Sequence, residues 1–213
     1  MSAQSVRGKT SVAIKSIVFD FGNVIGCFDH ELVYQKLVPL AGVPSETLRS
    51  VLFDARLEDD YESGRVITAE LLRHVRGACG FRCADDELIA AYADMFWPNQ
   101  PVCDLVPRLK PRYRLLLLSN TNELHANQFR WQFADTLSHF DHQILSYEVG
   151  VRKPNPGIFE RCQRLAECAP AECVFIDDLA KNVEGGRAFG WHGIVYQGIE
   201  DLRQRLAQIG VLV

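Results

Sequence analysis

The sequence of 213 residues predicts an α/β protein, in which helices cover both faces of a parallel sheet and a helical segment is inserted after the first strand. Two observations support this fold class. Short apolar runs alternate with helical patterns over residues 101–213, which is typical of βαβ units with right-handed crossovers. Residues 28–100 instead contain several helical patterns and no convincing strand. The chain is long enough for a core with a smaller appendage.

Five apolar runs are predicted to be strands. The first covers residues 14–19 (IKSIVF) and stops at Asp20-Phe-Gly-Asn, as a buried strand that ends in a turn would. The later runs are residues 113–118, 143–146, 173–176 and 193–196, of which 143–146 is the weakest. In a parallel sheet, the carboxyl ends of these strands should form the ligand crevice.

Helical patterns fill the segments between the strands. Asn155-Pro156 supplies an N-cap and a first-turn proline, and a helix over residues 182–189 ends at Gly190. The apolar residues after Pro156 share one face, and they are Ile158, Phe159, Cys162, Leu165 and Ala166. Within the insertion, helices are predicted at residues 31–40, 45–53, 69–79 and 85–96.

Composition and charge exclude several classes of function. A net charge of −4 gives no electrostatic reason to expect a nucleic-acid partner. No apolar run approaches the roughly 20 residues that span a bilayer, and residues 1–9 lack the apolar stretch of a secretory signal. We therefore expect a cytoplasmic protein with no membrane partner, either a monomer or a homodimer. Residues 1–12 are predicted to be a flexible tail.

Polar residues follow four of the predicted strands directly or closely. They are Asp20 after the first strand, Ser119 and Asn120 after residues 113–118, Lys153 after residues 143–146, and Asp177 and Asp178 after residues 173–176. Because parallel strand ends converge, these groups should meet in one crevice. Their combination suits phosphoryl transfer, which needs an in-line nucleophile, a hard cation and fixed positive charge.

Each role in phosphoryl transfer has a candidate residue. Asp20 can attack phosphorus and form an aspartyl phosphate, while Asp20 and Asp178 can share Mg²⁺. The Ser119 hydroxyl and backbone N–H groups near Asn120 can cradle the phosphate, and Lys153 can neutralise it. The sequence thus predicts catalysis at Asp20 and Lys153, with substrate binding at Ser119, Asn120 and Lys153.

Four segments, IVFDFGNV, LLLLSNTNE, GVRKPNPGIFE and FIDDLAKNVEGGRAFGWHGI, resemble motifs I to IV of the haloacid dehalogenase superfamily, in order. The chain is further similar to the subfamily IA group that contains bacterial α-glucose-1-phosphate phosphatases and the amino-terminal phosphatase domain of soluble epoxide hydrolases. The resemblance implies a Rossmann-like core, residues 13–27 and 101–213, and a helical cap, residues 28–100. It also implies Mg²⁺-dependent hydrolysis of a small phosphate ester, a sugar phosphate being one candidate.

The resemblance also implies a set of metal ligands. Aligning DLAKN with the family pattern D-x3-D/N places a ligand at Asp178, with Asp177 and Asn182 as supporting residues. Asp177 is the alternative ligand, because the two aspartates are adjacent. The carboxylate of Asp20 and the backbone carbonyl of Gly22 would complete the protein ligands.

Gly22 departs from the pattern of most phosphatases in the superfamily, which carry at this position a second Asp that protonates the leaving oxygen. Glycine cannot donate a proton, and general acid catalysis is worth about 10² to 10⁴ in rate. Ordinary alkyl phosphates are therefore expected to be poor substrates, and sugar-1-phosphates better ones, because their leaving oxygen is less basic. Solvent, the substrate or a cap residue must then supply the proton.

Two other functions remain open. In a hydrolytic 2-haloacid dehalogenase, Asp20 would attack carbon, and Gly22 would be no obstacle because halide needs no proton. The paired carboxylates of Asp177 and Asp178 argue against this function. In a non-catalytic binding or regulatory module on the same fold, the catalytic residues would have no reason to occur together.

Several aromatic and charged residues outside the four motifs are candidates for substrate contact or for packing. Candidates for substrate contact in the cap are Phe53, Arg56, Tyr61, Glu62 and Trp97. His125 and Trp131, which follow the second motif, are predicted to have packing or surface roles.

Overall fold

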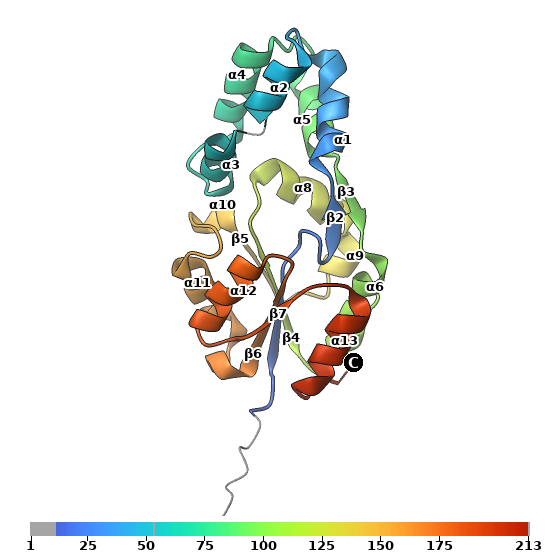
Figure 1. Cartoon of the computed structure of the whole chain (residues 1–213), viewed down its shortest axis with the longest axis vertical. Helices are drawn as coiled ribbons and strands as arrows, with labels where there is room; N and C mark the ends of the chain where they lie inside the picture. Colours follow the sequence, from blue (N-terminus) through green and yellow to red (C-terminus); the bar gives the residue numbers. More distant parts are fainter. Residues whose placement is uncertain (1–11, 53, 213) are drawn as a thin grey trace, which may run out of the picture.

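The computed structural model describes residues 12–52 and 54–212. The predicted tail, residues 1–12, lies outside the described residues except for Val12. Figure 1 shows a central sheet flanked by helices, with a second group of helices beyond one end of the strands.

Five strands form one sheet in the order β5-β4-β1-β6-β7. They are β1 (Ser16–Phe19), β4 (Arg114–Ser119), β5 (His142–Leu145), β6 (Cys173–Asp177) and β7 (His192–Val195). Every neighbouring pair is parallel. The predicted α/β class and parallel sheet are therefore confirmed, and each predicted apolar run contributes a strand.

Helices cover both faces of this sheet. Alternate residues of β1 enter different apolar clusters, Ile17 and Phe19 one and Val18 the other. The Val18 face packs against α11 (Pro156–Ala166), and α12 (Ala180–Ala188) lies beside α11 in Figure 1. The opposite face packs against α8 (Glu123–Gln132) and α13 (Ile199–Gln208).

Local sequence explains where these helices begin. The Asn155 side chain accepts a 2.9 Å hydrogen bond from the Gly157 N–H, so the predicted N-cap of α11 is confirmed. Shorter elements complete the core, namely α6 (Gln100–Cys103), α7 (Val106–Leu109), α9 (Ala134–Leu137), α10 (Ser146–Val149) and η2 (Pro170–Glu172). In the described part of the chain, no helix combines the length and apolarity needed to cross a bilayer.

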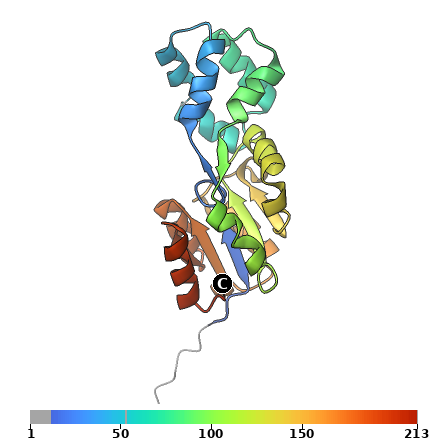
Figure 2. The same cartoon turned by 90° about the vertical axis from the view of Figure 1, so that its right-hand side faces the viewer.

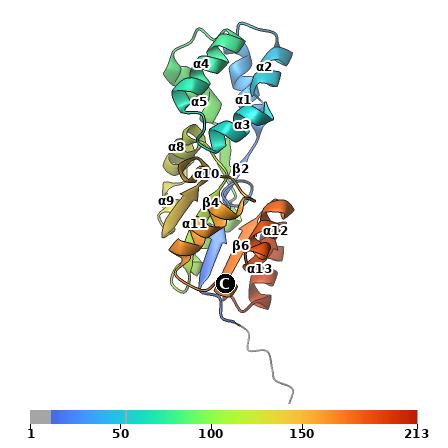
Figure 3. The same ribbon diagram turned by 90° about the vertical axis from the view of Figure 1, so that its left-hand side faces the viewer.

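The insertion lies over the carboxyl ends of the strands, as Figures 1, 2 and 3 agree in showing. Its helices are α1 (His30–Leu37), η1 (Val38–Leu40), α2 (Ser45–Leu52), α3 (Ala55–Glu62), α4 (Thr68–Cys79) and α5 (Asp85–Ala93). The helix α3 was not predicted, since its sequence ARLEDDYE has few apolar residues to mark a buried face.

The prediction that residues 28–100 contain no strand was wrong. β3 (Phe96–Pro98) pairs antiparallel with β2 (Gly26–Phe28), and these two strands lead the chain into the insertion and back. Consequently the predicted helix 85–96 ends early, at Ala93. Strands of three residues are too short to display the alternation by which a strand is recognised in a sequence.

Candidate active site

Asp20 lies at the carboxyl end of the central strand β1. Its backbone N–H donates a 2.8 Å hydrogen bond to the Ile176 carbonyl, so the chain follows the strand path up to this residue. Only 7% of Asp20 is exposed. A carboxylate buried to this degree requires positive charge nearby.

Lys153 supplies positive charge from the loop after α10. Its Nζ lies 2.7 Å from Asp20 Oδ1 and 2.6 Å from Asp177 Oδ2. It also donates a 2.8 Å hydrogen bond to the Leu118 carbonyl in β4, so three acceptors meet the three protons of the ammonium group. Burial acts to lower the pKa of Lys153, but the charges of Asp20 and Asp177 outweigh burial and leave this pKa raised.

Ser119 and Asn120 connect the end of β4 to the Lys153 loop. The Lys153 N–H donates to Asn120 Oδ1 at 2.7 Å, and Asn120 Nδ2 donates to the Lys153 carbonyl at 3.1 Å. This reciprocal pair fixes the loop that carries the lysine. Ser119 Oγ makes only a 3.4 Å contact with the Asn120 carbonyl, which leaves the hydroxyl able to bind a ligand.

Asp177 points into the protein and is fully occupied by donors. It is completely buried at the end of β6. Besides the contact with Lys153, it accepts a 2.9 Å hydrogen bond from the Leu179 N–H. Asn182 Nδ2 lies 3.0 Å from one Asp177 oxygen and 3.2 Å from the other. Both oxygens of Asp177 therefore already have partners within the chain.

Asp178 has a different environment from its neighbour. It is half-buried, and its Oδ2 accepts a 3.1 Å hydrogen bond from Asn23 Nδ2. Burial raises the pKa of Asp178, and the Asn23 hydrogen bond opposes this effect. Among the described residues, Asn23 is the one side chain that donates a hydrogen bond to Asp178. This carboxylate is therefore better placed than Asp177 to bind an ion.

Three carboxylates and one ammonium form a cluster whose charges do not balance. Single oxygens of Asp20, Asp177 and Asp178 lie within 4.8 Å of one another. Burial, together with repulsion from Asp177 and Asp178, raises the pKa of Asp20 to about 7 against the opposing effect of Lys153. When all three carboxyl groups are ionised, Lys153 offsets one of the three negative charges, and two remain. Hard oxygen ligands with this residual charge fit Mg²⁺.

A cavity lies between this cluster and the insertion. Gly22, Ser119 and Asn120 line it on the side of the sheet, and His30, Glu58 and Glu62 line it on the opposite side. A Cβ added at Gly22 would lie 2.9 Å from Phe28 Cε1, so any larger residue at this position requires the ring to move. The metal-ligand role of the Gly22 carbonyl stays a prediction.

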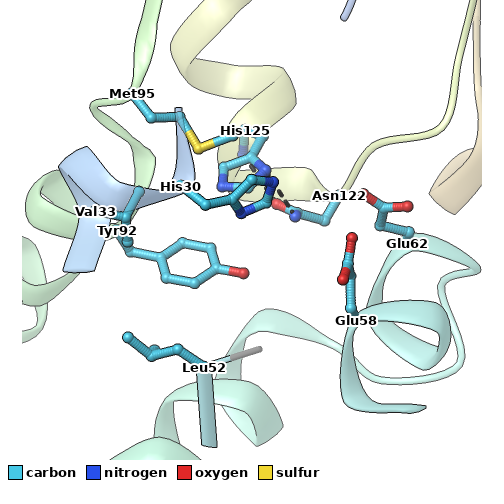
Figure 4. Close-up of a pocket in the computed structure, with 9 residues that line it drawn as sticks. All are labelled: His30, Val33, Leu52, Glu58, Glu62, Tyr92, Met95, Asn122 and His125. Atoms are coloured by element: carbon cyan, nitrogen blue, oxygen red, sulfur yellow. Dashed lines mark hydrogen bonds between the residues drawn. The ribbon is translucent and has the colours of Figure 1, made fainter. Parts of the chain in front are cut away.

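A second cavity extends from the first beneath the insertion. The residues that line both cavities are His30, Glu58, Glu62, Met95 and His125. Figure 4 shows this second cavity, in which Glu58 and Glu62 project from α3 and the Tyr92 hydroxyl points toward the same space. The space next to the proposed reaction centre is therefore lined by carboxylates, histidines and a phenol.

Glu62 is the buried carboxyl group among these residues. It closes α3, one turn after the exposed Glu58. Burial raises the pKa of Glu62 to about 7, although the charge of Arg152 acts to lower it. Glu62 Oε2 lies 2.9 Å from Arg152 Nε, but the two atoms are not aligned as a hydrogen bond.

His125 has the predicted packing role and also lines both cavities. Its Nδ1 lies 3.0 Å from Asn122 Nδ2, and Asn122 Oδ1 accepts from the His125 N–H at 3.0 Å. Since the amide nitrogen of Asn122 donates to Nδ1, the ring proton lies on Nε2, which has no hydrogen-bond partner in the described structure. Burial lowers the pKa of His125 to about 3, so the imidazole is neutral.

Among the described residues, none of the other expected substrate contacts lines these two cavities. Arg56 is exposed, 44% of Trp97 is exposed, and neither lines these cavities. The Tyr61 hydroxyl hydrogen-bonds with Thr68 at 2.8 Å, and Trp131 lies on the surface. Phe53 lies outside the described residues.

The sequence did not predict several residues that line the cavities, namely His30, Glu58, Tyr92 and Asn122. One signal was available for Glu58, because its spacing of four residues from Glu62 places both carboxyl groups on the same face of a helix.

Comparison with known families identifies this arrangement. The family model for haloacid dehalogenase-like hydrolases matches residues 14–190, which is most of the chain and includes every residue of the cluster. The chain belongs to this family. The predicted relationship is thereby confirmed, and the protein is a hydrolase of the haloacid dehalogenase type.

Two relatives show how similar this chain is to other members of the family. The D-ribitol-5-phosphate phosphatase of Bacteroides thetaiotaomicron is 27% identical over 202 residues, 92% of this haloacid dehalogenase-like hydrolase and 98% of the relative. The crystal structure of a HAD family enzyme from the same organism in complex with magnesium superimposes with a TM-score of 0.77. That structure is 25% identical and covers 92% of this chain and 99% of its own.

A more distant structure shares only the fold of this haloacid dehalogenase-like hydrolase. The L-2-haloacid dehalogenase of Xanthobacter autotrophicus, with chloropropionic acid covalently bound, superimposes with a TM-score of 0.61 at 20% identity. The match covers 94% of this chain and 85% of the dehalogenase. The fold alone therefore does not distinguish phosphatase from dehalogenase chemistry, and the site must do so.

Proposed function

We propose that this hydrolase is a Mg²⁺-dependent phosphatase that acts on a small phosphorylated metabolite through an aspartyl phosphate formed on Asp20. The observation that carries the proposal is the cluster of three carboxylates around Lys153, with its residual charge of two. A dehalogenase displaces halide from carbon with a single carboxylate, so it has no need for two further carboxylates beside its nucleophile. The proposal is supported by the D-ribitol-5-phosphate phosphatase and by the magnesium complex among the relatives.

Each residue of the cluster has a distinct role in this proposal. Asp20 is the nucleophile, and Lys153 holds its carboxylate in position and neutralises the incoming phosphate. Ser119 Oγ and the backbone at Asn120 bind the phosphate oxygens. Asp177 acts as a positioning residue for Lys153, because both of its oxygens are occupied by chain donors.

Mg²⁺ would be held by Asp20, the Gly22 carbonyl and Asp178, and it would neutralise charge on the phosphate oxygens. Asp178 is preferred over Asp177 because it is half-buried and engages a single side-chain donor. Residues 13–27 and 101–213 then form the catalytic core, and residues 28–100 form a cap that encloses the substrate. A sugar or sugar-alcohol phosphate fits the polar lining between core and cap.

Removal of divalent metal is the direct test of this function. Turnover of p-nitrophenyl phosphate is expected to fall to background after EDTA treatment and dialysis, and to return with added Mg²⁺. This substrate has a good leaving group, so its turnover does not depend on a general acid. A dehalogenase would release halide from a 2-haloacid equally well with or without EDTA, and a binding module would turn over neither compound.

The choice between the two adjacent aspartates can be tested by comparing two substitutions. Asp178→Asn is expected to raise the Mg²⁺ concentration for half-maximal activity by at least roughly 10-fold to 100-fold, because the loss of a residue that merely supports a metal ligand already costs this much and a charged ligand is lost here. Asn182→Ala should have a smaller effect, because Asn182 contacts Asp177 and not Asp178. Titration of activity and of Tm with Mg²⁺ would measure both. The reverse order would move the ligand assignment to Asp177.

A further inference from the structure

The structure leaves a proton unassigned in the proposed reaction, because the position that carries the acid in related phosphatases is Gly22. Resting on the phosphatase function proposed above, we infer that Glu62 of the cap donates a proton to the leaving oxygen. Glu62 lines the cavity, is anchored to the core and carries a buried carboxyl group.

Glu62 faces the reaction centre from across the cavity. It lines the same cavity as Gly22, Ser119 and Asn120, which lie on the sheet side. The leaving group of a phosphate bound at the sheet edge must project into this space, since the attack by Asp20 and the departure are roughly in line. The carboxyl of Glu62 therefore lies on the side of the phosphate from which the leaving oxygen departs.

Two contacts anchor Glu62 to the core. The Ser146 hydroxyl donates a 2.6 Å hydrogen bond to the Glu62 carbonyl, and Arg152 Nε lies 2.9 Å from Glu62 Oε2. Both partners belong to the segment that leads from β5 to Lys153. The position of Glu62 is thus set by the same segment that positions Lys153, and among the carboxyl groups that line the cavity Glu62 is the buried one.

The Glu62 carboxyl group is available for proton transfer. In the described structure, no donor makes a hydrogen bond to it, and Arg152 directs its Nη1 to Asp59 at 2.7 Å. The positive charges of Arg152 and Lys153 favour the carboxylate, whereas burial and the negative charges of Glu58 and Asp59 favour the acid. Burial dominates and raises the pKa of Glu62 to about 7, near the value that suits a general acid at neutral pH.

The other polar groups that line the cavities suit this task less well. His125 is neutral because burial lowers its pKa to about 3, so it can donate a hydrogen bond but holds no acidic proton near neutral pH. Burial raises the pKa of the Tyr92 phenol, which makes it a weaker acid. Glu58 is exposed and has no such anchoring contact to the core.

Atoms, electron pairs and protons are conserved in both steps of the proposed reaction. An oxygen of Asp20 forms a bond to phosphorus while the bond from phosphorus to the leaving oxygen breaks, and the bonding electron pair remains on that oxygen. The leaving oxygen takes the Glu62 proton and departs as an alcohol, leaving an aspartyl phosphate and a Glu62 carboxylate. Water then attacks phosphorus and gives one proton to Glu62, while the bond from phosphorus to the Asp20 oxygen breaks and its electron pair returns to the Asp20 carboxylate. Inorganic phosphate is released, and both side chains return to their initial states.

The test compares leaving groups in the full-length Glu62→Gln variant. We expect kcat/KM for an alkyl phosphate such as glycerol phosphate to fall by roughly 10²-fold, and kcat/KM for p-nitrophenyl phosphate to change little, because p-nitrophenolate departs without a proton. The variant should also release p-nitrophenol in a burst, since hydrolysis of the aspartyl phosphate loses its base. Equal losses of kcat/KM on both substrates, without a burst, would overturn the inference.

A pH measurement on the unmodified enzyme tests the same inference without a variant. The ratio of kcat/KM for the alkyl phosphate to that for p-nitrophenyl phosphate, each corrected for the ionisation of its own phosphate group, cancels the titration of Asp20 and of the metal site. This ratio should fall as pH rises through about 7, because Glu62 loses the proton it must donate. The role of Glu62 would be contradicted if this ratio did not change between pH 5.5 and pH 8.5, which lie on either side of the pKa near 7.

Glu58→Gln is the matched control, because it removes the same charge one turn earlier on α3. Whatever its effect on KM, it should keep the leaving-group dependence of the parent enzyme. Failure of the phosphatase function itself is distinguishable, because the parent would then show no Mg²⁺-dependent turnover of p-nitrophenyl phosphate. If the parent turns over that ester and Glu62→Gln behaves as Glu58→Gln does, the inference alone is wrong.

Discussion

Asp20→Asn is expected to abolish turnover of p-nitrophenyl phosphate, with kcat reduced by a factor of roughly 10⁴ or more, as for other nucleophile replacements. An amide oxygen is a poor nucleophile toward phosphorus, and the substitution also removes one charge from the metal site. Assays of purified parent and variant at saturating Mg²⁺ would measure the effect. A variant that keeps more than a few per cent of the parent activity would refute the assignment of Asp20 as the nucleophile.

The fold of the Asp20→Asn variant should remain intact. Asparagine has nearly the same volume, and Lys153 keeps its contacts with Asp177 and the Leu118 carbonyl. Without Mg²⁺, the Tm of the variant is expected to equal or exceed that of the parent, because a carboxylate crowded by two others is removed. A large drop in Tm would mean that lost activity reports unfolding, so both measurements belong together.

Lys153→Met is expected to lower the stability of the protein more than Asp20→Asn or Asp178→Asn does. The variant leaves the buried carboxylates of Asp20 and Asp177 without their shared cation. Removing one partner from a buried ion pair typically lowers the free energy of unfolding by about 3 to 5 kcal/mol. Denaturant unfolding of metal-free parent and variant would measure the difference, and the variant should have no detectable turnover.

The matched control is Lys15→Met, which breaks an exposed ion pair. The side chain of Lys15 is 61% exposed, and its Nζ lies 2.7 Å from Glu172 Oε1. Such a pair contributes about 0 to 1 kcal/mol, so this substitution should barely change stability. Added Mg²⁺ should restore part of the stability of Lys153→Met by neutralising the carboxylates. Equal losses for the two variants would contradict the bridging role of Lys153.

The sequence predicted the core of the fold and the composition of the cluster because both depend on local patterns. Each buried strand is a compact apolar run, and in a parallel sheet the residue after such a run must lie at the carboxyl edge. Asp20 and Asp177 were located by this rule alone. Lys153 lies several residues beyond its strand, and the convergence of strand ends was still sufficient to place it near them.

The cavity was much less predictable, because its residues come from segments that are unrelated in sequence. His30, Tyr92 and His125 belong to α1, α5 and α8, and only tertiary packing brings them to one space. The helix α3 carries Glu58 and Glu62 but has little apolar periodicity, so the sequence did not reveal it. The resemblance favours Asp178 as the metal ligand but leaves Asp177 as the alternative, because the partners of the two aspartates, Asn182, Leu179 and Asn23, depend on the folded backbone.

The hydrogen bond between the Ser146 hydroxyl and the Glu62 carbonyl has a consequence for the timing of catalysis. The same Ser146 oxygen accepts a 2.9 Å hydrogen bond from the Thr121 N–H, so it connects residues 28–100 to the loop beside the residues proposed to bind phosphate. If the cap swings away to admit substrate, this contact breaks and Glu62 leaves the site with it. The proposed acid would then be present only after the leaving group has been enclosed. Bond cleavage would in that case follow substrate capture, and a molecule too large to let the cap close would be released unreacted.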